Sequence, residues 1–265
     1  ARHRDEWTLL RRRGEGVIGC YLGQREVRPI KLLASSDELL FIVLPYVAIC
    51  VFFLGTIVRY RTAPFTYSSL SSQFLENREH FWALVPFHFG IIAILTGHVV
   101  AFLIPRQVLL WNSRPLRLYI LEASALACGL LALVGIAAAI HRRLTFRKVR
   151  EVTSRLDWVV LGLILFQVVT RVLVAIYHPW GSSWFAAVLT PYLWSLVTLS
   201  PDISYLAGMP LAIKTHIGLA YVLIGLSPFT RLVHILVAPN PYLWRRPQVV
   251  RWYGRPDTSS AEPRV

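Results

Sequence analysis

The sequence is poor in charge and in cysteine, and both shortages exclude whole classes of protein. Charged residues fill 16% of the 265 positions, whereas about 25% is usual in a soluble domain. The three cysteines, Cys20, Cys50 and Cys128, lie far apart, so no CxxC, CxxCH or iron–sulfur spacing occurs. Covalent c-type haem, thiolate zinc and Fe–S clusters are therefore not expected. Any cofactor has to be held by other side chains.

What the sequence does have is apolar surface and positive charge. Hydrophobic residues make up 55% of the chain, the mean hydropathy is +0.52 and the net charge is +14. A charge of this size would suit a nucleic-acid partner, but the Lys and Arg residues lie in loops and tails between apolar runs. The cytoplasmic excess of Lys and Arg in membrane proteins explains that pattern more simply. We therefore expect membrane lipid and no nucleic acid as a partner.

Five stretches are long and apolar enough to cross a bilayer, which takes about 20 residues of helix. They are Leu39–Val58, Phe81–Ile104, Leu118–Ile140, Trp158–Tyr177 and Ile213–Val237. Residues 182–212 are too polar to span and carry Trp and Tyr suited to the interface, so we expect a surface loop or a short interfacial helix there. The sequence thus predicts an all-α integral membrane protein with five transmembrane helices.

The orientation of these helices follows from the charges of the loops. The loop after the first span, the loop after the third and the C-terminal tail hold three, six and five Lys and Arg residues, fourteen in all. The loops on the other face hold three, namely Arg106, Arg114 and Arg117. The positive-inside rule places the first face in the cytoplasm. We therefore expect an outer N-terminus and a cytoplasmic C-terminus in a bacterial cytoplasmic (inner) membrane.

The chain divides into three parts on this interpretation: a basic extension at 1–38, a five-helix domain at 39–237 and a cytoplasmic tail at 238–265. The extension disagrees with the orientation, because its eight Lys and Arg residues would lie outside. It also lacks the apolar core of a signal peptide. Either a basic segment is translocated, or the natural start of the protein lies downstream of Ala1.

Four histidines lie inside two of the spans: His88 and His98 in the second, His216 and His234 in the fifth. His3, His80, His141 and His178 lie in tails or at span ends, where a solvated ring is common. A polar ring within the hydrocarbon is costly, so a histidine there is functional by default. The alternative is an interhelical hydrogen bond, which two pairs on two helices make less attractive.

Helix geometry pairs these histidines across the two spans. His88 and His98 are separated by a rise of about 15 Å, and His216 and His234 by about 27 Å and five whole turns of one helix. Because the two spans run in opposite directions, His88 faces His234 near the inner side, and His98 faces His216 near the outer side. Each pair can hold a haem iron through two axial imidazoles. Zinc, which takes about four ligands at one point, fits less well.

Two arginines inside the spans are candidate partners of haem propionates, because a carboxylate needs a cation where water is scarce. Arg231 lies one turn before His234 and would serve the inner haem. Arg171 lies in the outer third of the fourth span and would serve the outer haem. Arg231 has an equally good alternative, which is to extend towards the lipid headgroups.

Several segments resemble the gamma subunit of respiratory nitrate reductase, a five-span di-haem cytochrome b, over roughly residues 39–250. The most specific are Arg59-Tyr60 with Ser71-Ser72-Gln73, Phe87-His88-Phe89-Gly90-Ile91 through Gly97-His98, and Pro228-Phe229-Thr230-Arg231-Leu232-Val233-His234. The resemblance implies two b-type haems, the inner one on His88 and His234 and the outer one on His98 and His216. It also implies a quinol site near the outer haem, with a loop lysine whose nearest match here is Arg117. His98 and Arg117 are the quinol-site candidates.

The resemblance further implies the place of this chain in a complex. Quinol would be oxidised outside, and its electrons would pass through both haems to an Fe–S subunit and a molybdenum catalytic subunit on the cytoplasmic face. Alternatives remain: the same cytochrome in a nitrite oxidoreductase or another molybdoenzyme, a transporter, or a haem-binding anchor. A transporter would predict internal repeats or broken helices in matched positions, and no repeat is seen.

Overall fold

A computed structural model describes residues 35–63, 66 and 78–237, and the described part is helical throughout. Five of its helices are long and apolar enough to cross a membrane: Ser36–Thr62, Glu79–Leu103, Pro115–Thr145, Arg155–Tyr177 and Leu211–Phe229. The prediction of five spans is confirmed. The expected extension at 1–38 and tail at 238–265 lie almost entirely outside the described residues.

The helices begin where the chain provides N-terminal signals. The first span comprises α2 (Ser36–Glu38), a π-helical turn η1 (Leu39–Val43) and α3 (Leu44–Thr62). Pro115 occupies the first turn of α6 (Pro115–Thr145), where its missing N–H costs nothing. Ser154 caps α8 (Arg155–Tyr177) by accepting from the Asp157 N–H, and the Asp157 carboxylate accepts from the Ser154 N–H in return.

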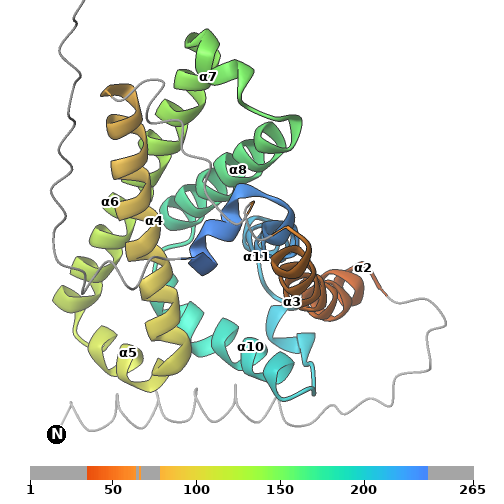
Figure 1. Cartoon of the computed structure of the whole chain (residues 1–265). Helices are drawn as coiled ribbons and strands as arrows, with labels where there is room; N and C mark the ends of the chain where they lie inside the picture. The colour runs from red at the N-terminus through yellow and green to blue at the C-terminus, as the bar shows by residue number, and fades with distance from the viewer. Residues whose placement is uncertain (1–34, 64–65, 67–77, 238–265) are drawn as a thin grey trace, which may run out of the picture.

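Shorter helices gather at the two ends of the bundle (Figure 1). One end holds α5 (Pro105–Asn112), α9 (Gly181–Trp184), the π-helical turn η4 (Phe185–Leu189), α10 (Thr190–Val197) and the 3-10 turn η5 (Ile203–Leu206). We call it the α10 end. The other holds α7 (Arg147–Glu151) and is called the α7 end. The segment 105–117, expected as a loop, is helical up to Asn112 because Pro105 starts a new helix.

Side chains of α10 complete the end of α4 (Arg78–Leu103). Pro105 has no N–H to offer the Ala101 carbonyl, and the Thr190 hydroxyl donates to that carbonyl instead, at 3.2 Å. The Trp194 indole donates to the neighbouring Phe102 carbonyl at 3.3 Å. The residues 182–212 are therefore more than a surface loop, because they satisfy the backbone of the helix that carries His98.

The same region also contributes to the core. Tyr192 is fully buried and donates from its hydroxyl to the Phe41 carbonyl at 2.8 Å. Leu189, Leu196 and Leu206 are buried with it against the first and fifth spans. The expected short helix is present, and one face of α10 packs inwards while Trp194 and Val197 on it stay exposed.

The helices α4 and α6 approach each other closely, and glycine makes this approach possible. A methyl group on Gly90 would lie 2.6 Å from the Cys128 carbonyl oxygen, and one on Gly135 would lie 2.7 Å from the Phe87 Cα. Both contacts are with backbone, so only glycine fits. This crossing fixes the part of α4 that carries His88.

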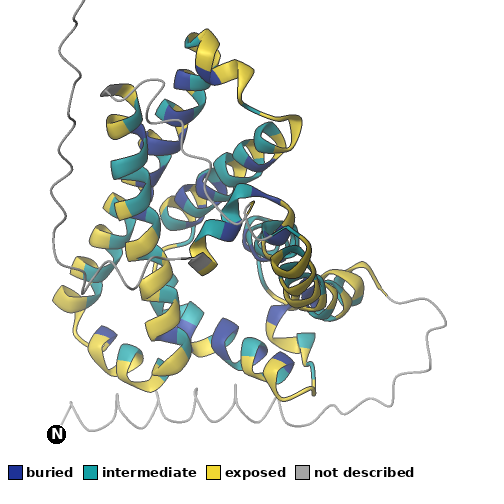
Figure 2. Cartoon of the chain, viewed as in Figure 1, coloured by how far each residue is buried: buried dark blue, intermediate teal, exposed yellow. Residues whose placement is uncertain are grey.

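Exposed residues, drawn in yellow in Figure 2, lie on the outer faces of the bundle, and many of them are large and apolar. Phe53, Leu54 and Phe89 are 59%, 62% and 70% exposed. Water would not tolerate so wide an apolar surface on a monomer, whereas lipid would. The exposed belt agrees with a transmembrane protein.

The fifth span differs from its prediction. It was expected as one helix from Ile213 to Val237, but α11 covers Leu211–Leu226 and is followed by 3-10 turns, η6 (Ser227–Phe229) and η7 (Arg231–Val237). Pro228 cannot continue an α-helix because it lacks the N–H and its ring meets the preceding turn. The Arg59 guanidinium donates to the Pro228 and Thr230 carbonyls, at 2.5 and 2.9 Å, and so stabilises the break.

Candidate functional site

His88 on α4 and His234 on η7 lie against each other. Their ring centroids are 6.1 Å apart and the ring planes are inclined at 68°. Two metal–imidazole bonds of about 2.1 Å, as found for zinc, together with about 1.1 Å from each nitrogen to its ring centre, give roughly 6.4 Å. The separation of the two rings therefore suits one metal ion bound between them.

The free nitrogen of each ring can be assigned from the hydrogen bonds. His88 Nδ1 lies 2.8 Å from the Leu84 carbonyl oxygen, and His234 Nδ1 lies 2.6 Å from the Arg231 carbonyl oxygen. A carbonyl only accepts, so each Nδ1 carries the hydrogen and each Nε2 keeps its lone pair. A backbone carbonyl at Nδ1 is the usual partner of a metal-bound imidazole.

The pairing of His88 and His234 is reached by another route than the one the sequence suggested. The sequence placed His216 and His234 five whole turns apart on one helix. The break at Pro228 makes that rise of about 27 Å wrong, because 3-10 turns differ from α-helix in pitch and in residues per turn. In Figure 1, η7 lies near the middle of the bundle, which brings His234 to α4.

His98 lies towards the α10 end of α4 and shows the same arrangement as His88. Its Nδ1 is 2.8 Å from the Ile94 carbonyl oxygen, and its ring packs edge-on against Phe185, with centroids 4.9 Å apart. The hydrogen therefore sits on Nδ1, and Nε2 is available as a ligand. Phe185 belongs to η4, so the segment between the fourth and fifth spans also determines how this ring is oriented.

His216 on α11 is held by side chains of α8. The Thr170 hydroxyl donates to the Gln167 carbonyl at 2.9 Å, so its oxygen accepts from His216 Nδ1 at 3.0 Å. The Gln167 amide nitrogen lies 3.3 Å from His216 Nε2 and marks that atom as the acceptor. His98 is close enough for its charge to act on His216. The two rings thus share one region; Nε2 of His98 keeps its lone pair, and Nε2 of His216 accepts from the Gln167 amide, which a ligand would have to displace.

The arginine Arg171 connects this histidine pair to a carboxylate. Its charge acts on His98 and His216, and the Glu122 carboxylate of α6 acts on Arg171 in turn. Arg171 follows Thr170, which contacts His216, in the chain, and its role towards a haem propionate stays a prediction. Glu122 was passed over in the sequence because a single carboxylate near a helix start carries no motif.

Arg231 occupies a different setting from the one expected. Its Nε forms an ion pair with Asp157 Oδ1 at 2.9 Å, and its Nη2 donates to the Val152 carbonyl at 2.9 Å. The side chains of Arg231 and Asp157 are 27% and 12% exposed. Arg231 lies three residues before His234 in the chain. A propionate beside His234 would have to share the Arg231 guanidinium with Asp157.

Arg117 lies on the exposed surface of the α10 end. Its guanidinium carbon sits 5.0 Å from the centroid of Trp111, which belongs to α5. Such a cation–π contact holds a side chain that is otherwise in solvent or headgroups. The structure thus places Arg117 against an exposed tryptophan ring, without a described contact to His98.

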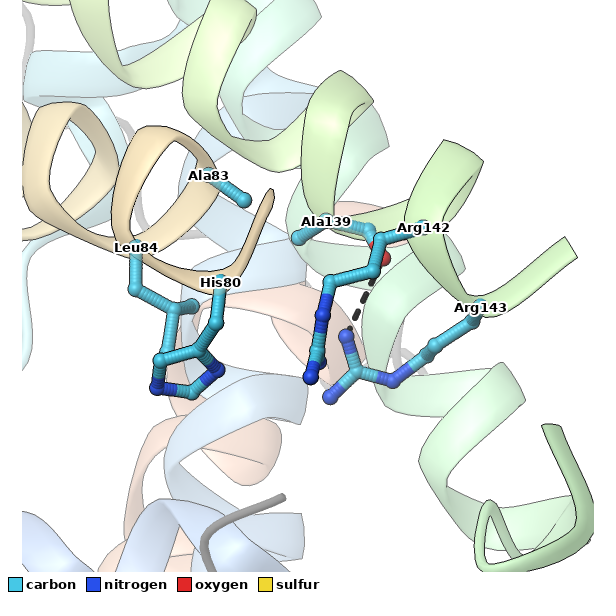
Figure 3. A pocket seen from close by; sticks show the side chains of 6 residues that line it. All are labelled: His80, Ala83, Leu84, Ala139, Arg142 and Arg143. Atoms are coloured by element: carbon cyan, nitrogen blue, oxygen red, sulfur yellow. Dashed lines mark hydrogen bonds between the residues drawn. The ribbon is translucent and has the colours of Figure 1, made fainter. Parts of the chain in front are cut away.

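A small pocket at the α7 end collects basic side chains (Figure 3). It is lined by His80, Ala83, Leu84, Ala139, Arg142 and Arg143. Arg142 is only 2% exposed, and Arg143 donates to the Ala139 carbonyl at 3.1 Å. In the sequence, these arginines were used only to orient the helices in the membrane. Their place at the very end of an apolar run is the feature of the sequence that could have indicated that Arg142 is buried.

The described bundle is a membrane protein whose interior carries four histidines on two spans, each with its hydrogen on Nδ1, a class that includes membrane cytochromes b. The nitrate reductase gamma subunit family model matches residues 37–253. The chain is 31% identical to the nitrate reductase gamma chain of Bacillus subtilis, over 82% of this chain and 98% of the relative. It is 34% and 32% identical to the respiratory nitrate reductase 2 and 1 gamma chains of Escherichia coli, over 78% and 80% of this chain and 93% and 95% of theirs.

The chain therefore belongs to the nitrate reductase gamma subunit family. It is a membrane subunit of a nitrate reductase complex, an oxidoreductase. The resemblance drawn from the sequence motifs is confirmed by these matches.

Proposed function

We propose that this subunit oxidises quinol at the α10 end and passes the electrons through two b-type haems to an Fe–S subunit at the α7 end. His98 and His216 hold the haem near the quinol, and His88 and His234 hold the second. The electrons continue to a molybdenum catalytic subunit that reduces nitrate.

The observation that carries the proposal is the His88–His234 pair, with ring centroids 6.1 Å apart and both Nδ1 atoms engaged by carbonyls. Each ring, with its hydrogen on Nδ1, presents a lone pair on Nε2, and the ring separation suits one metal ion between them. A haem iron uses one Nε2 on each side of the porphyrin.

The residues present fit such a group at both positions. At the position of His98 and His216, the Thr170 hydroxyl accepts from His216 Nδ1 at 3.0 Å and the Ile94 carbonyl accepts from His98 Nδ1 at 2.8 Å. A haem bound by two imidazoles supplies a reversible one-electron couple and leaves no open position for oxygen. Arg171 and Arg231 are the proposed propionate partners. The Arg231 guanidinium would be shared between the propionate and Asp157.

The direction of transfer follows from the proposed orientation. Loop charges place the α10 end outside and the α7 end in the cytoplasm, with the N-terminus outside and the C-terminus inside. Protons from quinol would then be released outside while electrons move inwards, which charges a bacterial inner membrane. The Fe–S subunit would dock through the loop 59–80 and the tail after Pro239, most of which lies outside the described residues.

Ligand variants of the purified complex test the proposal. Redox titration should show that His98→Ala and His216→Ala remove the same haem, because each leaves one axial position empty. His88→Ala and His234→Ala should remove or disturb the other haem. If His88→Ala and His98→Ala abolished one common potential, the assignment of the pairs would be wrong.

A further inference from the structure

Glu122 places a carboxylate inside a membrane span, two turns after the start of α6. A charged side chain within a span is costly and marks a function more often than not. The side chain is half-buried, and its Oε1 accepts from the Ser182 N–H at 2.8 Å and from the Ser182 hydroxyl at 2.6 Å. The carboxylate is thus held in one position by the turn that opens α9.

Polar groups from two further elements surround this carboxylate. The Asn112 amide of α5 donates to the Ser182 and Ser183 hydroxyls at 2.9 and 3.0 Å. Arg171 of α8 faces Glu122 closely enough for the two charges to interact. Phe185, three residues after Ser182, packs edge-on against the His98 ring with centroids 4.9 Å apart, so the segment that holds Glu122 also contacts the histidine pair.

Quinol oxidation at this pair requires a group that accepts protons, and the nearby residues leave few choices. Arg171 and Arg117 stay protonated and cannot act as a base. The Nδ1 atoms of His98 and His216 already donate to Ile94 and Thr170, and their Nε2 atoms are the proposed haem ligands. The groups proposed to bind haem therefore cannot also take the proton.

The other titratable side chains described at the α10 end form an ion pair or a cap of their own, or lie on elements other than α6. Asp37 forms an ion pair with Lys214 at 2.6 Å. Asp202 caps η5 by accepting from the Ser204 N–H at 2.9 Å. His178 follows α8 at its C-cap and is the competing candidate. Among the described carboxylates at this end, Glu122 is the one held by the segment that contacts the histidine pair.

We propose that Glu122 accepts the protons of quinol as its electrons leave, an inference that rests on the function proposed above. In each one-electron step a quinol O–H bond would break, an O–H bond would form on the Glu122 carboxylate, and the electron would leave to the haem that His98 and His216 are proposed to hold. Glu122 then releases the proton to water at the α10 end. Two such steps convert quinol to quinone, and Arg171 positions the carboxylate.

A purely structural role is the competing explanation, in which Glu122 only ties α6 to the turn before α9. Glu122→Gln separates the two, because the amide oxygen still accepts from the Ser182 N–H but cannot take up a proton at neutral pH. Ser182→Ala is the matched variant, since it weakens the tie and keeps the carboxylate. Glu122→Asp keeps the acid on a shorter side chain.

The test uses the intact complex in membranes, with haem content measured for every variant. In Glu122→Gln, quinol-dependent nitrate reduction should fall about 100-fold or more, while nitrate reduction driven by an artificial dye at the soluble subunits stays unchanged. Ser182→Ala should stay within about fivefold of the wild type, and Glu122→Asp should recover much of the rate. Glu151→Gln, which alters an exposed pair with Arg147 on α7, controls for loss of one negative charge.

A second readout is independent of turnover. The infrared difference spectrum between reduced and oxidised complex should contain a protonated-carboxyl C=O band that disappears in Glu122→Gln and persists in Ser182→Ala. Wild-type turnover in Glu122→Gln, an equal loss in Ser182→Ala, a loss confined to His178→Gln, or loss of haem in both Glu122 variants would each overturn the proposal. A wild-type complex that shows two haems but no quinol oxidation would instead refute the proposed function.

Discussion

Gly135→Ala tests whether the close crossing of α4 and α6 is what positions His88. An added methyl group would lie 2.7 Å from the Phe87 Cα, 2.8 Å from the Ala83 carbonyl oxygen and closer still to the Phe87 nitrogen. Carbon contacts are ordinarily about 3.5–4.0 Å. All three atoms are backbone, so no side-chain rotation relieves the clash, and α4 has to move by about 1 Å.

The energetic effect can be bracketed from this geometry. Overpacking of a tight interior costs about 1–3 kcal/mol, and a rigid backbone neighbour favours the upper part of that range. Replacing glycine by alanine inside a helix recovers about 1 kcal/mol. We expect a net destabilisation of about 2 kcal/mol. A bound constellation tolerates displacements of about 0.5 Å, so His88, next to Phe87, should lose its alignment with His234.

The assay is the reduced-minus-oxidised spectrum of the purified complex, together with the thermal midpoint for loss of haem absorbance. Gly135→Ala should lower the midpoint and diminish the haem held by His88 and His234, and the other haem should remain. Gly162→Ala is the matched control, since a methyl group there meets no atom within 4 Å. Equal midpoints and haem contents in the two variants would refute the argument.

Three further perturbations address the remaining site residues. Arg231→Gln leaves the Asp157 carboxylate, 12% exposed, without its cation. This variant should lower the stability of the subunit by about 1–3 kcal/mol and lower the reduction potential of the haem on His234. Adding Asp157→Asn should restore most of the stability. An unchanged thermal midpoint and an unchanged potential would contradict this expectation. Arg117→Ala should reduce quinol-dependent turnover with dye-driven turnover unchanged if Arg117 orients quinol, and wild-type rates and inhibitor sensitivity would make it an anchor on Trp111. Truncation after Pro241 should release the soluble subunits from membranes with haem content intact, and retained attachment would count against docking through the tail.

The five spans could be predicted from the sequence because lipid imposes a requirement that is local in the chain. A run of about 20 apolar residues is sufficient to cross the bilayer, and four of the predicted ranges fall within the observed helices to within a residue or two. The fifth range failed at Pro228, where an apolar run continues after the α-helix has ended. Hydrophobicity indicates that a segment lies in the membrane. Whether the segment stays α-helical depends here on the N–H that Pro228 lacks and on Arg59, which donates to this backbone from another helix.

The histidines could be found in the sequence because a buried imidazole stands out among apolar residues. Their supporting groups could not. Thr170 and Gln167 hold His216 from a helix some 46 and 49 residues away in the chain, and neither has a distinctive local pattern. Glu122 carries no motif of its own in the sequence, and its link to Ser182 depends on a turn 60 residues later. Such partners become visible only when the helices are packed together.

The central claim is that this chain holds two b-type haems, and the most direct test is the number and type of haem per chain. A pyridine haemochrome assay on the purified complex, combined with acid extraction, should give two non-covalent b haems for each copy of the subunit. One haem per chain, or a c-type spectrum that resists extraction, would contradict the account.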